Sequence, residues 1–69
     1  MHVTFTDVHY DAIHGRFEGR VDIHREGGIF RYPCSLNGPK SMSEDQVRLG
    51  LAQHAMRMSD TPKRANSNR

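Results

Sequence analysis

The segment RFEGRVDIH, residues 16–24, decides the fold because apolar and polar residues alternate along almost its whole length. Its large apolar residues, Phe17, Val21 and Ile23, share one parity. The other parity carries only ionisable side chains, those of Arg16, Glu18, Arg20, Asp22 and His24. A period of two predicts a β-strand with one buried face and one face in water. Gly19 falls on the apolar parity, which predicts a bulky neighbour above it.

The residues before this strand predict another strand that contains an irregularity. The segment HVTFTDVHY, residues 2–10, begins with regular alternation. Its large apolar residues form two pairs of opposite parity, Val3 with Phe5 and Val8 with Tyr10. A β-bulge near Asp7 would bring both pairs to one face, whereas without a bulge the strand would end early. We favour the bulge. The turn DAIHG, residues 11–15, then connects the two strands.

The residues after the central strand predict a third strand at an edge of the sheet. The turn REGG, residues 25–28, leads into IFRYPCSL, residues 29–36. The apolar parity of this strand contains Phe30, Tyr32, Cys34 and Leu36. Pro33 lies on the opposite parity. Because proline cannot donate a hydrogen bond to a neighbouring strand, we expect this strand at an edge, as in a meander of three consecutive strands.

The segment SEDQVRLGLAQHAMRMSD, residues 43–60, predicts a helix. Ser43 and Gln46 have the spacing of a capping box, and Glu44 and Asp45 suit the positive end of the helix dipole. The sequence therefore predicts an α+β fold: a three-stranded antiparallel meander followed by one C-terminal helix packed on one sheet face (β-β-β-α).

The apolar residues of the predicted helix fall on two sides. One side contains Val47, Gly50, Leu51, His54, Ala55 and Met58. We expect this side to pack on the sheet residues Phe17, Val21, Ile23, Phe30, Tyr32 and Leu36, with Gly50 allowing a close approach. Leu49, Ala52 and Met56 lie roughly opposite, and the chain offers nothing else to cover them. The polar residues that flank these three are Arg48, Gln53 and Arg57.

The second apolar side has two interpretations. Single exposed apolar residues are common on protein surfaces and need no explanation. Alternatively, Leu49, Ala52 and Met56 form a patch that docks on another protein or on a second copy of the chain. The open edge of the first strand offers a second way to associate, because a second copy or another protein could add a strand there. A bulge near Asp7 would protect part of that edge.

The chain is short and its positive charge is concentrated at one end. Its 69 residues form one domain at most, which we place at residues 1–60. The segment TPKRANSNR, residues 61–69, holds Lys63, Arg64 and Arg69 and no acid. Seven of the ten Lys and Arg residues and all eight acids therefore lie in residues 1–60, a net charge of −1. We expect residues 61–69 to be a disordered basic tail, because they carry no large apolar side chain.

No residue pattern in the sequence indicates catalysis. The five histidines lack metal-site spacings such as H-x₃-H or H-E-x-x-H, and Cys34 falls on the core parity. We expect no enzymatic activity, metal, cofactor or small-molecule substrate. The single cysteine allows no intrachain disulfide and is typical of a reducing cytoplasm. The polar residues near the N-terminus do not resemble a signal sequence or a membrane span, so we expect a cytoplasmic protein.

The preferred function is a small non-enzymatic interaction protein, such as a bacterial or phage-type regulator or inhibitor, that docks through its helix or forms a homodimer. The alternative is a nucleic-acid-binding accessory protein. Its basic residues would be Arg16, Arg20 and Arg31 on the wet sheet face and Lys63 and Arg64 in the tail. The acids Glu18 and Asp22 interrupt the basic residues of the sheet, which favours cross-strand pairing over a continuous positive field.

Overall fold

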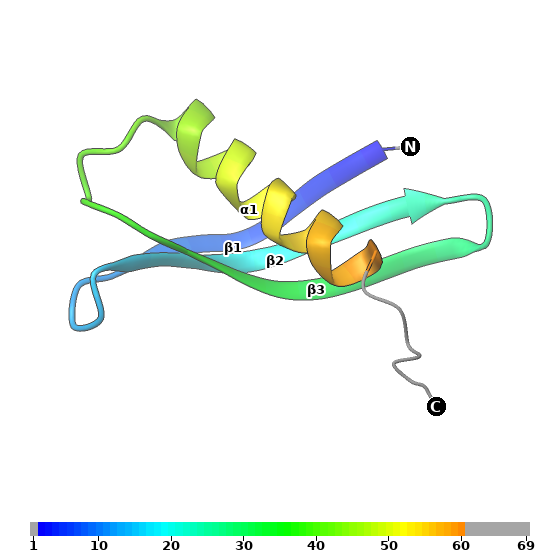
Figure 1. Ribbon diagram of the computed structural model, residues 1–69, viewed down its shortest axis with the longest axis horizontal. Coiled ribbons are helices and arrows are strands. Elements are labelled where there is room, and N and C mark those ends of the chain that lie inside the picture. Colours follow the sequence, from blue (N-terminus) through cyan, green and yellow to red (C-terminus); the bar gives the residue numbers. More distant parts are fainter. Residues whose placement is uncertain (1, 61–69) are drawn as a thin grey trace.

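The computed structural model describes residues 2–60. The elements are β1 (His2–Asp11), β2 (Arg16–Arg25), β3 (Gly28–Asn37) and α1 (Glu44–Asp60). The three strands form one antiparallel sheet in the order β1-β2-β3, and α1 lies across one of its faces (Figure 1). The predicted α+β meander with a C-terminal helix is confirmed. The predicted disordered tail, residues 61–69, lies outside the described residues.

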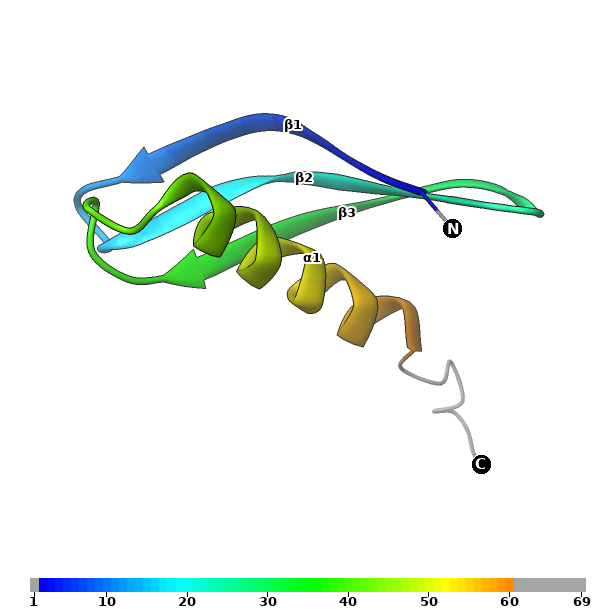
Figure 2. The ribbon, with the colours of Figure 1, turned by 90° about the horizontal axis from the view of Figure 1, so that it is seen from above.

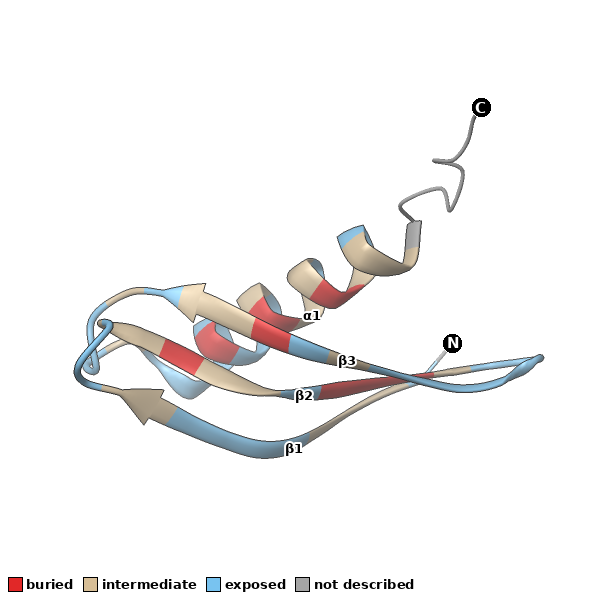
Figure 3. Cartoon of the chain, turned by 90° about the horizontal axis from the view of Figure 1, so that it is seen from below, coloured by how far each residue is buried: buried red, intermediate tan, exposed pale blue. Residues whose placement is uncertain are grey.

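The core lies between α1 and the two strands that it covers, β2 and β3 (Figure 2). Its buried apolar residues are Phe17, Val21, Ile23, Cys34, Val47, Leu51 and Ala55. Figure 3 shows these buried positions on β2, β3 and the inner side of α1. Val21, Ile23 and Leu51 are completely inaccessible to solvent. The alternation of β2 thus supplies the centre of the core, as the sequence predicts.

A β-bulge shapes β1, and its position agrees with the prediction. The register against β2 shifts between Thr6 and His9, so that Asp7 and Val8 lie opposite Gly19 alone. Asp7 has a φ of 58°, in the left-handed region that few non-glycine residues adopt. A Cβ atom on Gly19 would lie 2.9 Å from Val8 Cγ2 and 3.1 Å from Val8 Cα. The bulge therefore requires glycine on the facing strand.

Local contacts fix the start of α1 and its distance from the sheet. The Gln46 N–H donates to Ser43 Oγ at 3.2 Å, and the Ser43 N–H donates to Gln46 Oε1 at 3.4 Å, which completes the capping box. Further along the helix, a Cβ atom on Gly50 would lie 2.5 Å from Leu36 Cδ2. The absence of a side chain at Gly50 lets α1 approach β3 closely, as predicted.

One predicted core contact is wrong. Phe30 shares the parity of the core residues, but it is 44% exposed and does not pack against the buried cluster. Its neighbour Ile29 is 60% exposed. The reason is the path of α1, which crosses the sheet diagonally and leaves the far end of the β2–β3 hairpin uncovered (Figures 2 and 3).

Within residues 2–60, no helix is long and apolar enough to cross a membrane.

Candidate functional site

An open apolar groove runs between α1 and β1. We call its lining residues the α1–β1 strip; they are Val3, Leu49, Ala52, Gln53, Met56 and Arg57. The groove has a volume of about 520 Å³. The predicted patch of Leu49, Ala52 and Met56 therefore forms one wall of the groove, and Val3 of β1 contributes to the other. The structure thus brings together the helix patch and the first strand, whose proximity the sequence does not predict.

The three predicted helix residues differ in how far they are covered. Leu49 is 61% exposed and lies on the side of α1 opposite its buried residues. Ala52 and Met56 are half-buried, and Met56 also packs against the core cluster. Among the described residues, Leu49 thus stays largely uncovered, whereas Met56 is partly covered by the chain's own core. Val3 was missed because periodicity alone does not show which strand borders a helix.

The predicted polar rim flanks the apolar residues of the strip. Arg48 pairs with Glu44 at 2.8 Å, and its guanidinium lies 5.8 Å from the centre of the Phe5 ring. This cation–π contact extends the apolar surface from α1 onto the first half of β1. Gln53 and Arg57 are exposed along the opposite rim. Long polar side chains thus border the apolar part of the groove.

The first half of β1 is an exposed sheet edge next to this strip. β1 is an outer strand of the sheet, so its far side presents N–H and C=O groups that no other described strand pairs with. Residues 2–6 pair regularly with β2 up to the bulge. They include no proline, aspartate, glutamate, lysine or arginine. This stretch lacks the features that commonly protect a sheet edge.

The open face of the sheet is covered by paired charges. Asp22 accepts two hydrogen bonds from the Arg31 guanidinium, at 2.8 and 3.1 Å, and is only 7% exposed. Arg31 lowers the pKa of the Asp22 carboxyl because its hydrogen bonds, and then its positive charge, favour the ionised form. Arg16 pairs with Glu18 at 2.8 Å, and Arg20 pairs with Asp7. Each of the three sheet arginines of the nucleic-acid alternative therefore pairs with a carboxylate.

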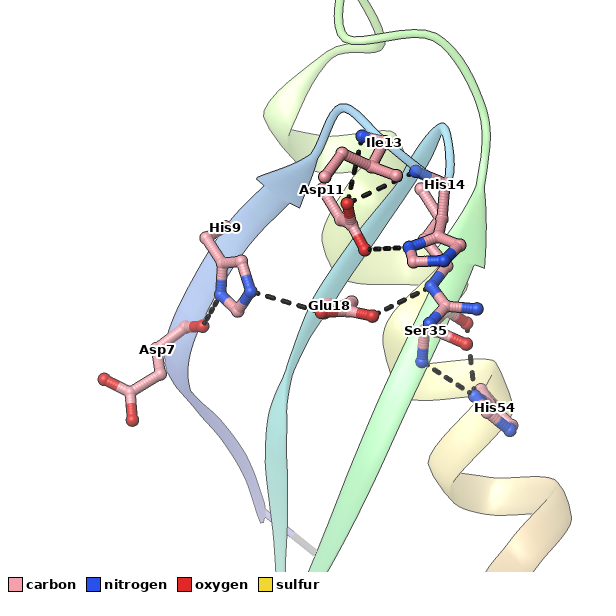
Figure 4. Close-up of polar contacts among 9 residues, drawn as sticks. Asp7, His9, Asp11, Ile13, His14, Glu18, Ser35 and His54 are labelled. Atoms are coloured by element: carbon pink, nitrogen blue, oxygen red, sulfur yellow. Dashed lines mark hydrogen bonds and ion pairs between the residues drawn. The ribbon is translucent and has the colours of Figure 1, made fainter.

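Two histidines take part in the same polar surface (Figure 4). His9 lies between the backbone carbonyl of Asp7, 2.8 Å from Nδ1, and Glu18, 3.3 Å from Nε2. The carbonyl and then the carboxylate raise the pKa of His9. His14 Nδ1 lies 2.6 Å from Asp11, whose pKa this hydrogen bond lowers. The contact between Asp11 and His14 stabilises the β1–β2 turn, and the contact between His9 and Glu18 joins β1 to β2 on the open face of the sheet.

The described residues contain no assembled metal or nucleophile site. Within residues 2–60, no three His, Cys, Asp or Glu side chains are placed to hold a metal ion. Cys34 is buried, and burial raises the pKa of its thiol, which keeps the sulfur protonated at neutral pH. The Ser35 N–H donates to His54 Nδ1 at 3.0 Å, so this partly buried histidine joins α1 to β3. Lys63 and Arg64 lie outside the described residues.

Comparison of the chain with protein-family models, curated proteins and solved structures gives no match. The function therefore has to be inferred from the surface of the chain itself.

Proposed function

We propose that this chain is a small non-enzymatic protein-interaction module that docks through the α1–β1 strip. The observation that carries the proposal is the groove in which the exposed Leu49 stands beside Ala52, Met56 and Val3. Scattered apolar residues are common on protein surfaces, but a contiguous apolar surface rimmed by polar side chains is typical of an interaction site. The rim residues Arg48, Gln53 and Arg57 supply that border.

The size of the core supports an intermolecular role for the strip. Only seven apolar residues are buried among the described residues. Complete burial of a leucine or methionine side chain contributes roughly 1.5–3 kcal/mol. Burial of Leu49 and Met56 against a partner would thus add a substantial stabilising free energy to that of a small core. The flexible side chain of Met56 also suits a surface that adapts to a partner.

We propose a protein partner, which is either a second copy or another chain, and no cofactor or small-molecule substrate. The buried free thiol of Cys34 is compatible with the reducing cytoplasm, where we place the protein. The nucleic-acid alternative has less support because Arg16, Arg20 and Arg31 are paired with acids. That alternative predicts a salt-sensitive mobility shift with nucleic acid that is lost when residues 61–69 are deleted.

A charge placed in the strip tests the proposal. Leu49→Glu adds a carboxylate to the groove at a position exposed enough to leave the fold intact. Ile13→Glu is the matched control, because Ile13 is 90% exposed in the β1–β2 turn, away from the strip. We expect Leu49→Glu to abolish stoichiometric self-association or complex formation, measured by sedimentation and by co-purification at fixed stoichiometry, and Ile13→Glu to retain it. Equal association of both variants and the wild type would refute docking through the strip.

A further inference from the structure

We infer that the partner is a second copy of this chain, added edge to edge along residues 2–6 of β1. The two sheets would then form one continuous six-stranded sheet with both α1 helices on the same face. This inference rests on the proposed function and names its partner. It follows from three features of the structure: which edges are protected, how residues 2–6 match themselves, and where the α1–β1 strip lies.

Residues 2–6 of β1 are the longest stretch of free sheet edge among the described strands that contains no bulge, proline, acid, lysine or arginine. The free edge of β3 contains Pro33, which cannot donate a hydrogen bond to an added strand. The second half of β1 is distorted by the bulge at Asp7 and Val8. Residues 2–6 are regular, lack charged side chains that would oppose a strand, and include Val3, Thr4 and Phe5, which favour strands.

Residues 2–6 are complementary to themselves in an antiparallel pair. A two-fold axis at Thr4, the centre of the stretch, places Thr4 opposite Thr4 of the second copy and Val3 opposite Phe5. Threonine pairs and pairs of an aromatic with a β-branched residue are favourable cross-strand neighbours. No like charges face each other across this axis, because none of the five residues is an acid, lysine or arginine.

The α1–β1 strip supplies the remaining contact area. Stable protein interfaces bury about 1,200–2,000 Å² in total, which is more than five paired strand residues provide. Val3 belongs both to the free edge and to the strip. Extension of the sheet at this edge therefore puts Phe5 of the second copy beside Val3, at the open side of the groove that Leu49 and Met56 line. The edge supplies the register, and the strip supplies the apolar area.

Cysteine cross-linking tests both the partner and the register. In a Cys34→Ala background, Thr4→Cys places two thiols opposite each other, where Cβ atoms lie about 4.5–5.5 Å apart. Thr6→Cys is the matched control, because its nearest partner position is His2 of the second copy and the two thiols lie about 13 Å apart along the strands. Under mild oxidation, or with a short thiol cross-linker, we expect covalent dimer from Thr4→Cys and little from Thr6→Cys.

A charge swap at the same position provides an independent measurement. If residue 4 faces itself, Thr4→Lys alone or Thr4→Glu alone should weaken the dimer by about two- to fivefold in Kd. A mixture of the two variants should recover the affinity through a heterodimer, and sedimentation or native mass spectrometry would detect it. A heterologous partner would give no such recovery.

The outcomes separate this inference from the proposed function. Absence of Thr4→Cys cross-linking, or equal cross-linking of both variants, would overturn pairing at β1 with this register. If Leu49→Glu nevertheless abolished a complex with a different protein, the strip would remain a docking surface and only the identity of its partner would be wrong. If Leu49→Glu changed no association and Thr4→Cys gave no covalent dimer, both proposals would fail.

Discussion

Gly19 is the residue on which the shape of β1 depends. It faces the two bulge residues Asp7 and Val8, and a Cβ atom there would lie 3.1 Å from the backbone of Val8. Backbone cannot move aside as the end of a flexible side chain can. The bulge in turn brings Val8 and Tyr10 to the same face as Val3, so the apolar residues of both halves of β1 lie on the face of the sheet that carries α1.

We therefore predict that Gly19→Ala destabilises the domain by about 1–3 kcal/mol, because it overpacks the bulge. Gly27→Ala is the matched control, since its Cβ atom would meet only Phe30 Cζ, at an ordinary 4.0 Å. Urea denaturation of the two variants measures the difference. Equal free energies of unfolding for both variants would contradict the role given to Gly19.

The ion pair between Asp22 and Arg31 predicts a pH dependence of stability. Arg31 lowers the pKa of Asp22 below its ordinary value of 3.8. The pair therefore stabilises the fold fully above this value, and the contribution is lost as the pH falls through 3.8 towards the lower pKa of the folded state. Thermal melts between about pH 6 and pH 2 should show this loss in the wild type.

Two variants should each reduce the same acid-dependent loss of stability. Asp22→Asn removes the titrating group, and Arg31→Gln removes the charge that shifts its pKa. Both should be less stable than the wild type at neutral pH and should depend less on pH below 4. Wild-type pH dependence in both variants would show that this pair does not control acid stability.

Among the elements, β2 and α1 could be predicted well from the sequence, whereas their relative placement could not. The alternation of β2 reports which face is buried, and the capping box at Ser43 reports where α1 begins. Neither pattern reports the angle at which a helix crosses a sheet. Phe30 was therefore wrongly assigned to the core, and Val3 was not recognised as a neighbour of α1.

The capping box at the start of α1 should contribute measurably to stability. Ser43→Ala removes the acceptor for the Gln46 N–H and should destabilise the domain by about 1 kcal/mol. Ser41→Ala, in the preceding loop, is a suitable control because Ser41 lies outside the capping box. Chemical denaturation monitored by circular dichroism measures both variants. A Ser43→Ala variant as stable as Ser41→Ala would mean that the capping box contributes little.

At the scale of the whole molecule, one helix covers only part of a long three-stranded sheet. It leaves the tip of the β2–β3 hairpin, the free edge of β1 and Leu49 of α1 exposed (Figure 2). The sequence predicted the exposed Leu49 because a helix can pack only one side on its own sheet. It could not show that Val3 and the free β1 edge adjoin that residue, since this juxtaposition arises from the twist and packing of the folded chain.

The mass of the purified chain in solution tests the central claim most directly. Sedimentation equilibrium should give a concentration-dependent mass that approaches twice the 7.9 kDa of one chain for the wild type and for Ile13→Glu. Leu49→Glu should sediment as a single chain. A wild type that stays monomeric at all concentrations, or a Leu49→Glu variant that dimerises as the wild type does, would contradict self-association through the α1–β1 strip.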